Sequence, residues 1–272
     1  VQTETKLKSS PLEQKILTNA KKIGFSDKQI GRAVNKEELE IRKIRKEYGI
    51  LPVVKQIDTL AAEWPAKTNY LYITYGGTNN DLSLGIEEQG IVVIGAGPYR
   101  IGSSVEFDWG TVNMVWGLQD NGEKNVVVVN CNPETVSTDY DICKRLYFEE
   151  LTLERILDIT EFESPKGVVT SVGGQTANNL TTKLSNNGVK IFGTSAEDVD
   201  SAENRSKFSQ VLDKLHIMQP AWQEFTNITD AKNFALEVGY PVLVRPSYVL
   251  SGAAMKTVWS QVELKKFVGD AT

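Results

Sequence analysis

Histidine and cysteine are scarce in this sequence. His216 is its only histidine, and Cys131 and Cys143 are its only cysteines. A structural zinc site needs four ligands of these types, and a cysteine nucleophile needs a histidine base, so the sequence predicts neither site. We expect the three residues to pack in a core or to lie at the surface, since a buried thiol behaves as a small hydrophobe. No metal ligand and no catalytic residue is assigned.

Long apolar runs and an excess of positive charge are missing as well. No run reaches the roughly 18 apolar residues of a membrane helix. The 30 basic residues stand against 35 acidic ones, which leaves a formal charge of -5. We therefore expect no membrane span and no binding to nucleic acid or to an anionic membrane. Without a signal pattern at its start, the protein is expected in a reducing compartment, the cytoplasm.

The two ends of the chain are unusual for a complete protein. The first residue is Val1 instead of Met, and the last predicted helix, Gln261 to Val268, lies close to Thr272. The 272 residues, 40% of them apolar, suffice for one large or two small domains. We expect a fragment of a longer protein.

Residues 10–48 have helical periodicity. Capping boxes are predicted at Ser26 with Gln29 and at Asn35 with Glu38. The charges of residues 36–46 alternate at helical spacing, which is typical of a solvated face with i,i+4 ion pairs. The apolar face of the first helix consists of Leu12, Ile16, Ala20 and Ile23. Residues 53–75 mix apolar runs with aromatic residues, and a boundary is expected between 76 and 90.

From residue 91 the chain alternates short apolar runs with longer amphipathic segments. Runs of this kind are typical of parallel strands that are buried on both faces. The predicted strands are Ile91 to Ile94, Val126 to Val129, Val168 to Val172, and Ile191 to Phe192. The predicted crossover helices are Ser103 to Gln119, Thr152 to Ile159, and Thr176 to Asn186. Residues 91–195 are therefore predicted to form a doubly wound α/β domain.

A further unit begins near residue 196. It is predicted to contain helices at Ala202 to Leu215 and at Asp230 to Val238, and a strand at Pro241 to Arg245. The unit lacks the strands and helices that would close it. We interpret residues 196–272 as the opening of a domain.

The turn from Gly95 to Gly102 follows a strand and opens a helix, as the dinucleotide fingerprint G-x-G-x-x-G does. Its spacing fails, because Arg100 stands where the third glycine belongs and Pro98 lacks a backbone N–H. We interpret it as a tight turn at the carboxyl edge of the sheet, with Arg100 able to face an anion.

Two more segments follow predicted strands and are expected at the same edge, where open α/β sheets bind ligands. The polar stretch from Asn130 to Asp141 offers hydroxyls, amides and carboxylates, and it is equally compatible with a structural loop. In the second segment two glycines permit close backbone approach. The candidate residues in the two segments are Asn132, Glu134, Thr135, Gly173, Gly174 and Gln175.

Two arginines could bind phosphate through their guanidinium groups. Arg245 ends a predicted strand before Pro246, and Arg205 lies on a helix. From spacing alone, an ordinary ion pair is the better interpretation of each, and nothing in the pattern pairs the two.

Six motifs follow one another along the chain. They are Gly97 to Gly102, Glu106 to Trp109, Asn130 to Asp141, Gly173 to Gln175, Ala202 to Arg205, and Val244 to Gly252. In this order and spacing they resemble the large, ammonia-using synthetase component of carbamoyl phosphate synthetase, and Lys22 to Tyr75 is similar to the helical region between its two halves. The Asn130 loop resembles the C-terminal half. Trp109 and the Ser103-Ser104 pair are similar to the animal multifunctional pyrimidine-synthesis proteins.

The resemblance implies a domain order and a reaction. Residues 1–78 become a helical linker or oligomerisation region, 79–90 a linker, 91–195 a pre-ATP-grasp domain, and 196–272 a truncated start of an ATP-grasp domain. The implied reaction is the phosphorylation of carbamate by ATP with Mg²⁺ or Mn²⁺. The implied partners are the other synthetase half, a glutaminase domain or subunit, and further copies of the chain.

Roles for individual residues also come from the resemblance. Arg205 and Arg245 match nucleotide-binding arginines, and Ser251 with Gly252 matches the start of a phosphate loop, where the first half of the family carries a glycine instead of Ser251. The metal ligands are expected downstream of residue 272, so the fragment alone is expected to be inactive.

Three alternatives stay open. Another ATP-grasp ligase of the biotin-carboxylase kind would lack the polar loop and the helical region. A scaffold segment and a dinucleotide-binding module are the others. The pathway, pyrimidine or arginine and urea, is not decided by the sequence.

Overall fold

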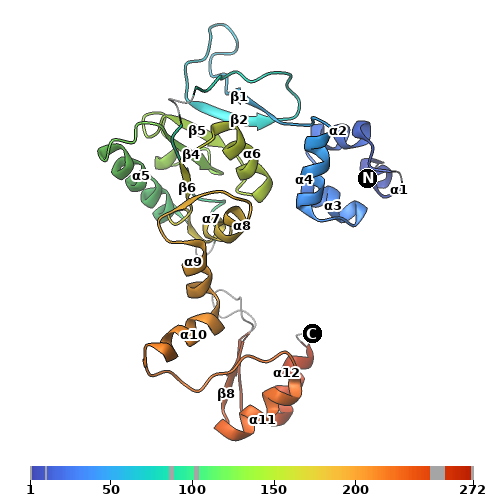
Figure 1. The fold of residues 1–272 in the computed structure, drawn as a ribbon, viewed down its shortest axis with the longest axis vertical. Coiled ribbons are helices and arrows are strands. Elements are labelled where there is room, and N and C mark those ends of the chain that lie inside the picture. The colour runs from blue at the N-terminus through green and yellow to red at the C-terminus, as the bar shows by residue number, and fades with distance from the viewer. Residues whose placement is uncertain (1, 10, 86–88, 101–103, 246–254, 271–272) are drawn as a thin grey trace. The chain divides into compact units, whose positions relative to one another are not determined.

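The computed structural model describes residues 2–9, 11–85, 89–100, 104–245 and 255–270 (Figure 1). The chain divides into two compact units, Val1–Thr194 and Ser195–Thr272. Each unit is described by itself below. No helix among the described residues combines the length and the apolar character that crossing a membrane requires.

Four helices open the first unit: α1 (Gln2–Ser9), α2 (Gln14–Lys22), α3 (Asp27–Val34) and α4 (Glu38–Glu47). They enclose a small core of Leu7, Leu17, Ala20, Ile30 and Ile41. The capping box of Ser26 with Gln29 is confirmed at the start of α3. The second predicted box is wrong, because Asn35 adopts a left-handed conformation (φ 55°) that ends α3, and Glu37 with Glu40 caps α4 instead.

A seven-stranded sheet forms the centre of the unit, in the order β1-β2-β5-β4-β3-β6-β7. All of its pairings are parallel except that of β1 with β2. The strands are β1 (Val53–Gln56), β2 (Tyr70–Thr74), β3 (Ile91–Ile94), β4 (Val126–Asn130), β5 (Arg145–Phe148), β6 (Gly167–Val169) and β7 (Ile191–Phe192). The four predicted strands β3, β4, β6 and β7 are confirmed.

Three strands were not predicted from the sequence. The run that forms β5 begins with a charged residue, Arg145, whose guanidinium is paired with buried Glu163 2.8 Å away. Residues 53–74 were expected to lie with the helical region, but β1 and β2 extend the sheet, with Leu71 paired to Tyr147 of β5. The helices of the N-terminal region therefore end with α4, and the strands after it belong to the sheet.

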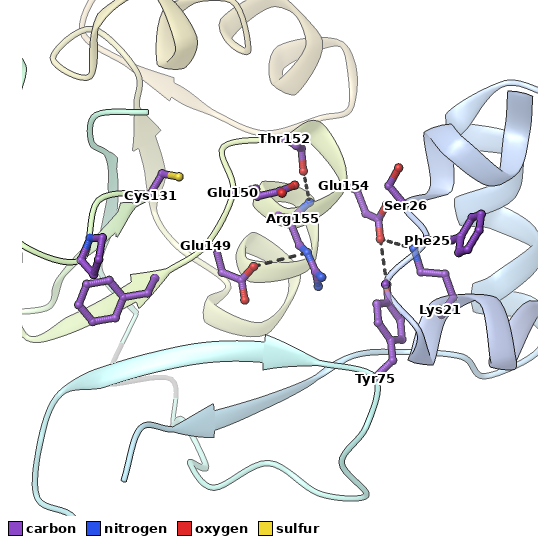
Figure 2. A pocket seen from close by; sticks show the side chains of 13 residues that line it. Lys21, Phe25, Ser26, Tyr75, Cys131, Glu149, Glu150, Thr152, Glu154 and Arg155 are labelled. Carbon is purple, nitrogen blue, oxygen red and sulfur yellow. Dashed lines mark hydrogen bonds and ion pairs between the residues drawn. The ribbon is translucent and has the colours of Figure 1, made fainter. Parts of the chain in front are cut away.

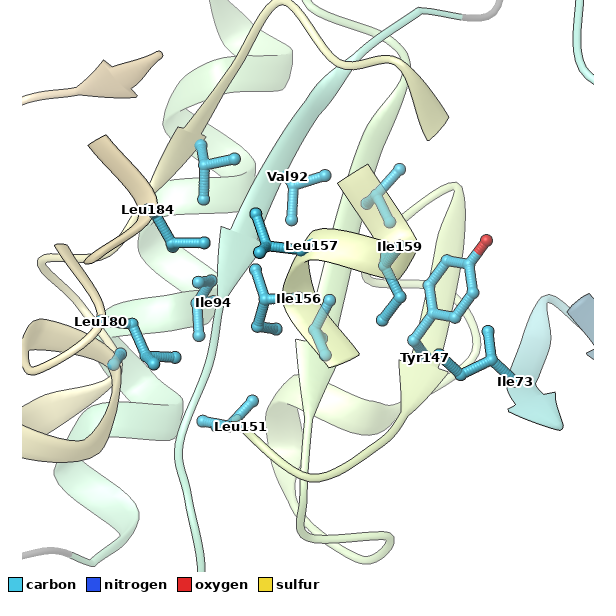
Figure 3. Close-up of a cluster of buried hydrophobic side chains, with 14 of the residues drawn as sticks. Ile73, Val92, Ile94, Tyr147, Leu151, Ile156, Leu157, Ile159, Leu180 and Leu184 are labelled. Atoms are coloured by element: carbon cyan, nitrogen blue, oxygen red, sulfur yellow. The ribbon is translucent and has the colours of Figure 1, made fainter. Parts of the chain in front are cut away.

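Helices cover both faces of the sheet, as a doubly wound fold requires. Because side chains alternate along a strand, Val92 and Ile94 of β3 face one layer while Ile91 and Val93 face the other. The first layer is formed by α6 (Leu153–Glu163), α7 (Gly174–Asn178) and α8 (Thr181–Asn186) (Figure 3). The second layer is α5 (Val105–Asp120), which packs through Val112 and Val115. The predicted α/β architecture is confirmed.

The second unit contains α9 (Ala196–Glu203), α10 (Arg205–Lys214), α11 (Ile228–Val238), β8 (Val242–Val244), β9 (Lys256–Val258) and α12 (Gln261–Asp270). Its buried residues are Ala235, Val258 and Leu264. The helix predicted from Ala202 to Leu215 is divided in two, because the Asn204 side chain accepts a hydrogen bond from the Lys207 amide and starts α10 anew. Neither α9 nor α10 contains a buried residue.

Candidate functional site

The loops that follow β3 and β6 meet at the carboxyl edge of the sheet. Gly173 is packed so closely that an added Cβ atom would collide with the Gly95 carbonyl oxygen. At Gly97 a Cβ would lie 2.9 Å from the Thr176 hydroxyl oxygen, so any larger residue would force the Thr176 side chain to move. Gly174 has a φ of 73°, a conformation that favours glycine. The loops after β3 and β6 therefore approach each other closely at this edge.

The polar loop after β4 lies at the same edge and is organised by its own side chains. Asn130 is fully buried, and its side-chain oxygen accepts a hydrogen bond from the Asn132 amide at 2.8 Å. The Asn132 side-chain oxygen in turn accepts from the Glu134 amide at 3.1 Å. The Thr135 hydroxyl lies 3.2 Å from the Tyr99 hydroxyl, within hydrogen-bonding distance. Both interpretations of this loop find support, since it is internally bonded and leaves the Glu134 side chain exposed.

Asp108 joins these loops and was not singled out by sequence reasoning. It is fully buried in the first turn of α5 and accepts hydrogen bonds from Asn130 (2.9 Å), Ser137 (2.7 Å) and Tyr99 (2.8 Å). One sequence signal could have found it. A carboxylate that lies one helical turn before Val112 is on the face that packs against the sheet, where an acidic residue needs partners.

Two further predicted edge residues are Arg100 and Gln175. Arg100 is exposed at the end of its turn. The Gln175 side chain donates to Asn179 at 2.7 Å, one helical turn further on. Their predicted role at the edge stays a prediction.

The two predicted arginines lie in the second unit. Arg205 is the first residue of α10, and Arg245 directly follows β8. Partial burial lowers the pKa of Arg245, and the positive charge of Arg205 lowers it further. Their predicted role in phosphate binding stays a prediction. Ser251 and Gly252 lie outside the described residues.

A cavity of about 500 Å³ lies beside the helical region in the first unit (Figure 2). It was not predicted. Its wall includes Lys21, Tyr75, Cys131, Glu149, Glu154 and Arg155. Burial raises the pKa of the Cys131 thiol and that of the Glu149 carboxyl. Tyr75 has three cationic groups over its ring, those of Lys21, Arg45 and Arg155.

One end of this cavity borders a buried ion cluster. The cluster consists of Lys21, Asp27, Arg42, Arg45, Glu154 and Asp158. Arg45 is central: its Nε lies 2.7 Å from Asp27 and its Nη2 lies 2.8 Å from Asp158 on α6. Burial alone would lower the pKa of Arg45, but Asp158, Tyr75 and Asp27 outweigh it and raise that pKa.

The cluster corrects the prediction of a solvated face for residues 36–46. The expected i,i+4 pair of Lys36 with Glu40 exists at 3.5 Å and is exposed. Arg42 and Arg45, however, are buried, because their partners come from α6, more than one hundred residues away in the sequence.

Among the described residues no group of three or more His, Cys, Asp or Glu side chains is arranged to hold a metal ion.

Three family models match successive parts of the chain. Residues 1–49 match the oligomerisation domain of the carbamoyl-phosphate synthetase large chain, residues 87–201 match the carbamoyl phosphate synthase preATP-grasp domain, and residues 204–272 match the ATP binding domain of the carbamoyl-phosphate synthase L chain. The chain belongs to the large-chain family of carbamoyl phosphate synthetase. The predicted order of helical region, pre-ATP-grasp domain and start of an ATP-binding domain agrees with these matches.

Similar proteins span several kinds of carbamoyl phosphate synthetase. The chain is 57% identical over 256 residues to the multifunctional protein URA2 of Saccharomyces cerevisiae, covering 94% of this chain and 11% of that protein. It is 54% identical over 266 residues to the mitochondrial carbamoyl-phosphate synthase [ammonia] of Rattus norvegicus, covering 98% and 18%. With the arginine-specific large chain of Eremothecium gossypii the identity is 53% over 266 residues, covering 97% and 24%. The chain thus spans only 11% to 24% of the length of these relatives.

A solved structure shows the same fold. The biotin carboxylase domain of the Hydrogenobacter thermophilus 2-oxoglutarate carboxylase is similar with a TM-score of 0.50 and 14% identity, covering 66% of this chain and 40% of that one. Identities above 50% to the synthetases and of 14% to this carboxylase assign the chain to the synthetase family.

Proposed function

We propose that this chain is part of the C-terminal synthetase half of a carbamoyl phosphate synthetase and takes part in the ATP-dependent phosphorylation of carbamate. The observation that carries the proposal is the carboxyl edge of the sheet. There the loops after β3, β4 and β6 converge, in the domain that matches the preATP-grasp model and directly before the one that matches the ATP-binding model.

Phosphoryl transfer requires that the reactants be positioned and that charge on the migrating group be neutralised. At the edge, Arg100 supplies a cation, Glu134 and Thr135 supply polar side chains, and the glycines at 173 and 174 let the backbone approach a ligand. We propose that these residues, with Asn132 and Gln175, line the site of the small acceptor.

The arginines of the second unit fit the phosphates of ATP. The positive charge of Arg205 lowers the pKa of Arg245, an effect that a bound anion would offset, and a guanidinium binds phosphate oxygens in a bidentate manner. We propose Arg205 and Arg245 as nucleotide-binding residues, and Ser251 with Gly252 as the start of a phosphate loop. Mg²⁺ or Mn²⁺ would be held by residues outside this sequence, and the chain alone is then inactive.

Partners, location and domain limits complete the proposal. The helical region matches an oligomerisation domain, which supports a homo-oligomer. The other synthetase half and a glutaminase domain or subunit are the proposed partners, carbamate is the proposed substrate, and the cytoplasm is the proposed location. Of the predicted domain limits, 79–90, 91–195 and 196–272 are proposed as well, whereas the predicted region 1–78 is divided, because β1 and β2 join the sheet.

The decisive experiment places this chain in a complete enzyme. The matching 256 residues of the yeast relative are replaced by this sequence, and ATP formation from ADP and carbamoyl phosphate is measured. Arg245→Ala is expected to reduce kcat/KM by a factor of about 30 to 1,000, as for the loss of about 2 to 4 kcal/mol of charge stabilisation.

Arg32→Ala is the matched control, since Arg32 is exposed on α3 and belongs to the helical region. It is expected to keep full activity. An inactive but folded chimera would refute the proposed reaction, whereas an Arg245→Ala enzyme with unchanged kinetics would refute only the assigned role of Arg245.

A scaffold role is the second candidate, because residues 1–49 match an oligomerisation domain. The mass of the purified chain in solution tests it. A concentration-independent dimer or tetramer together with an inactive chimera would favour the scaffold role over catalysis.

A further inference from the structure

Asp108 is a buried carboxylate whose hydrogen-bonding partners all come from loops of the candidate site. Its side chain has no exposed surface. Oδ1 accepts from the Asn130 amide nitrogen and from the Ser137 hydroxyl, and Oδ2 accepts from the Tyr99 hydroxyl. One carboxylate therefore holds both the turn after β3 and the loop after β4.

The partners of Asp108 are neutral, which sets it apart from the other buried acids of this unit. Among the described residues, no Lys or Arg forms an ion pair with it. A buried carboxylate without a cation is costly unless several donors are fixed around it. Its position in the first turn of α5 adds the favourable field of the helix N-terminus. The geometry of the three donors is what makes a charge tolerable here.

From Asp108 a chain of hydrogen bonds runs to the candidate residues. Because Asn130 donates its amide to Asp108 and to the Ser137 hydroxyl, which itself donates to Asp108, its side-chain oxygen is turned toward the Asn132 amide, 2.8 Å away. The Asn132 oxygen then accepts from the Glu134 amide. On the other side, the Tyr99 hydroxyl bonded to Asp108 also lies 3.2 Å from the Thr135 hydroxyl. The hydrogen bonds that start at the two carboxylate oxygens of Asp108 thus reach all three candidate residues of the loop.

We propose that Asp108 is a positioning residue, which fixes the orientation of the Asn130 amide and thereby the backbone of residues 132–135 at the acceptor site. It would not touch the substrate itself. The proposal rests on the proposed function for its effect on catalysis, and on the hydrogen bonds alone for its effect on the loop.

The variant Asp108→Asn separates hydrogen bonding from charge. The remaining oxygen can still accept from Asn130 and Ser137. The new amide can donate to the Tyr99 hydroxyl, which then donates to Thr135, since a hydroxyl can do both. Asp108→Ala removes every acceptor. If Asp108 positions the loop through these hydrogen bonds, Asp108→Ala is expected to have a large effect and Asp108→Asn a small one.

Amide hydrogen exchange of the purified chain tests the effect on the loop. In Asp108→Ala, exchange at the amides of Asn132 and Glu134 is expected to become at least about tenfold faster, which corresponds to the loss of one net hydrogen bond. In Asp108→Asn it is expected to stay within about threefold of the wild type. Asp120→Ala, at the exposed end of the same helix, is the matched control and is expected to change neither amide.

Kinetics of the chimeric enzyme test the effect on the site. Asp108→Ala is expected to raise KM for carbamoyl phosphate about tenfold or more and to leave KM for ADP unchanged, because the nucleotide is assigned to the second unit. Asp108→Asn is expected to restore most of the loss. A residue that only stabilised the fold would lower the amount of active enzyme without this selective change in KM.

Several results would overturn the proposal. Unchanged exchange at residues 132 and 134, unchanged KM for carbamoyl phosphate in a folded Asp108→Ala enzyme, or an Asp108→Asn variant as impaired as Asp108→Ala would each do so. If Asp108→Ala does not fold, Ser137→Ala and Tyr99→Phe each remove one donor and are expected to show part of the same effects. A wild-type chimera without activity would refute the proposed function. The hydrogen-exchange results would then be the only test of whether Asp108 positions the loop.

Discussion

Two groups of buried polar side chains in the first unit differ in chemistry and in what they hold together. The ion cluster sets Lys21, Arg42 and Arg45 against three carboxylates and joins the helical region to α6. The Asp108 network contains one carboxylate and neutral donors, and it joins two loops at the edge of the sheet.

The two groups differ in the side chains that are left without a partner when one member is removed. In the ion cluster the remainder is an unpaired buried charge, whose cost falls on the stability of the whole unit. In the Asp108 network the remainder is a set of neutral donors, some of which can turn to water or to each other, so the loop is released while the sheet persists. Burial of a polar group therefore does not by itself tell whether it stabilises the fold or orients a site.

The largest expected effect is that of Asp158→Ala. Asp158 lies between Arg42 (2.5 Å) and Arg45 (2.8 Å), so its loss leaves two buried guanidinium groups without that partner. We expect the free energy of unfolding to fall by about 3 to 5 kcal/mol. Urea denaturation followed by circular dichroism measures it.

The control for Asp158→Ala is Glu161→Ala on the same helix. Glu161 also lies 2.9 Å from Arg42, but it is 46% exposed, so the ion pair is screened by water and its loss is expected to cost less than about 1 kcal/mol. If both variants lowered the free energy of unfolding by an equally small amount, the ion cluster would not stabilise the packing of the helical region on α6. The contrast between the two polar groups would then be wrong.

Acid is expected to weaken the ion cluster next. Burial alone would raise the pKa of Glu154, but Lys21, the Asp27 amide and Arg45 outweigh it and lower that pKa below its usual 4.5. A carboxyl with a lowered pKa stabilises the fold fully above its unfolded value, and this contribution is lost as the pH falls through the lower folded value. The free energy of unfolding is therefore expected to decrease as the pH is lowered from 6 to 3.

Glu154→Gln isolates this contribution, because other carboxyls titrate in the same range. Glu149 acts with the opposite sign: burial raises its pKa, so its protonation favours the folded state as the pH falls. The Glu154→Gln variant is expected to lose part of the acid dependence. An acid dependence identical to that of the wild type would show that Glu154 does not titrate differently in the folded and unfolded states.

A smaller effect is expected for Tyr75→Phe. The Tyr75 hydroxyl lies 3.2 Å from Glu154 and 3.3 Å from Asp158, and it can donate to only one of them at a time. Its removal is expected to cost about 0.5 to 1.5 kcal/mol in thermal or urea unfolding. Tyr72→Phe, on the exposed side of β2, is the control. A loss as large as that for Asp158→Ala would mean that the Tyr75 hydroxyl contributes as much as a buried ion pair to holding the two parts together.

The same contrast explains what the sequence could predict. Strands β3 and β4 were found because Ile91 to Ile94 and Val126 to Val129 are unbroken apolar runs. Strand β5 was missed because Arg145 resembles a surface residue until its buried partner Glu163 is known. Arg45 was assigned to a solvated face because its neighbours in sequence are charged, while its partner Asp158 is 113 residues away.

The sequence also predicted only part of the candidate site. The sequence correctly indicated that the glycine-containing loop and the polar loop both lie at the carboxyl edge, since each directly follows a strand. The helical spacing of Asp108 from Val112 indicated a buried carboxylate but not its role, because a carboxylate becomes recognisable as a hub only when donors from two loops surround it. Local patterns predict elements and edges, whereas a polar contact between distant segments has no local pattern.

The smallest expected effect comes from an ion pair that joins the same two parts of the unit as the ion cluster but lies in solvent. Lys46 and Glu161 are 2.8 Å apart, and their side chains are 43% and 46% exposed. Water screens this pair and both side chains lose conformational freedom in forming it, so Lys46→Ala is expected to change the free energy of unfolding by about 0.5 kcal/mol or less. Added salt of 0.5 M should abolish even this difference, whereas the loss caused by Asp158→Ala should persist, because ions in solution do not reach the buried cluster. If Lys46→Ala and Asp158→Ala responded alike to salt, burial would not be what separates the two kinds of ion pair in this protein.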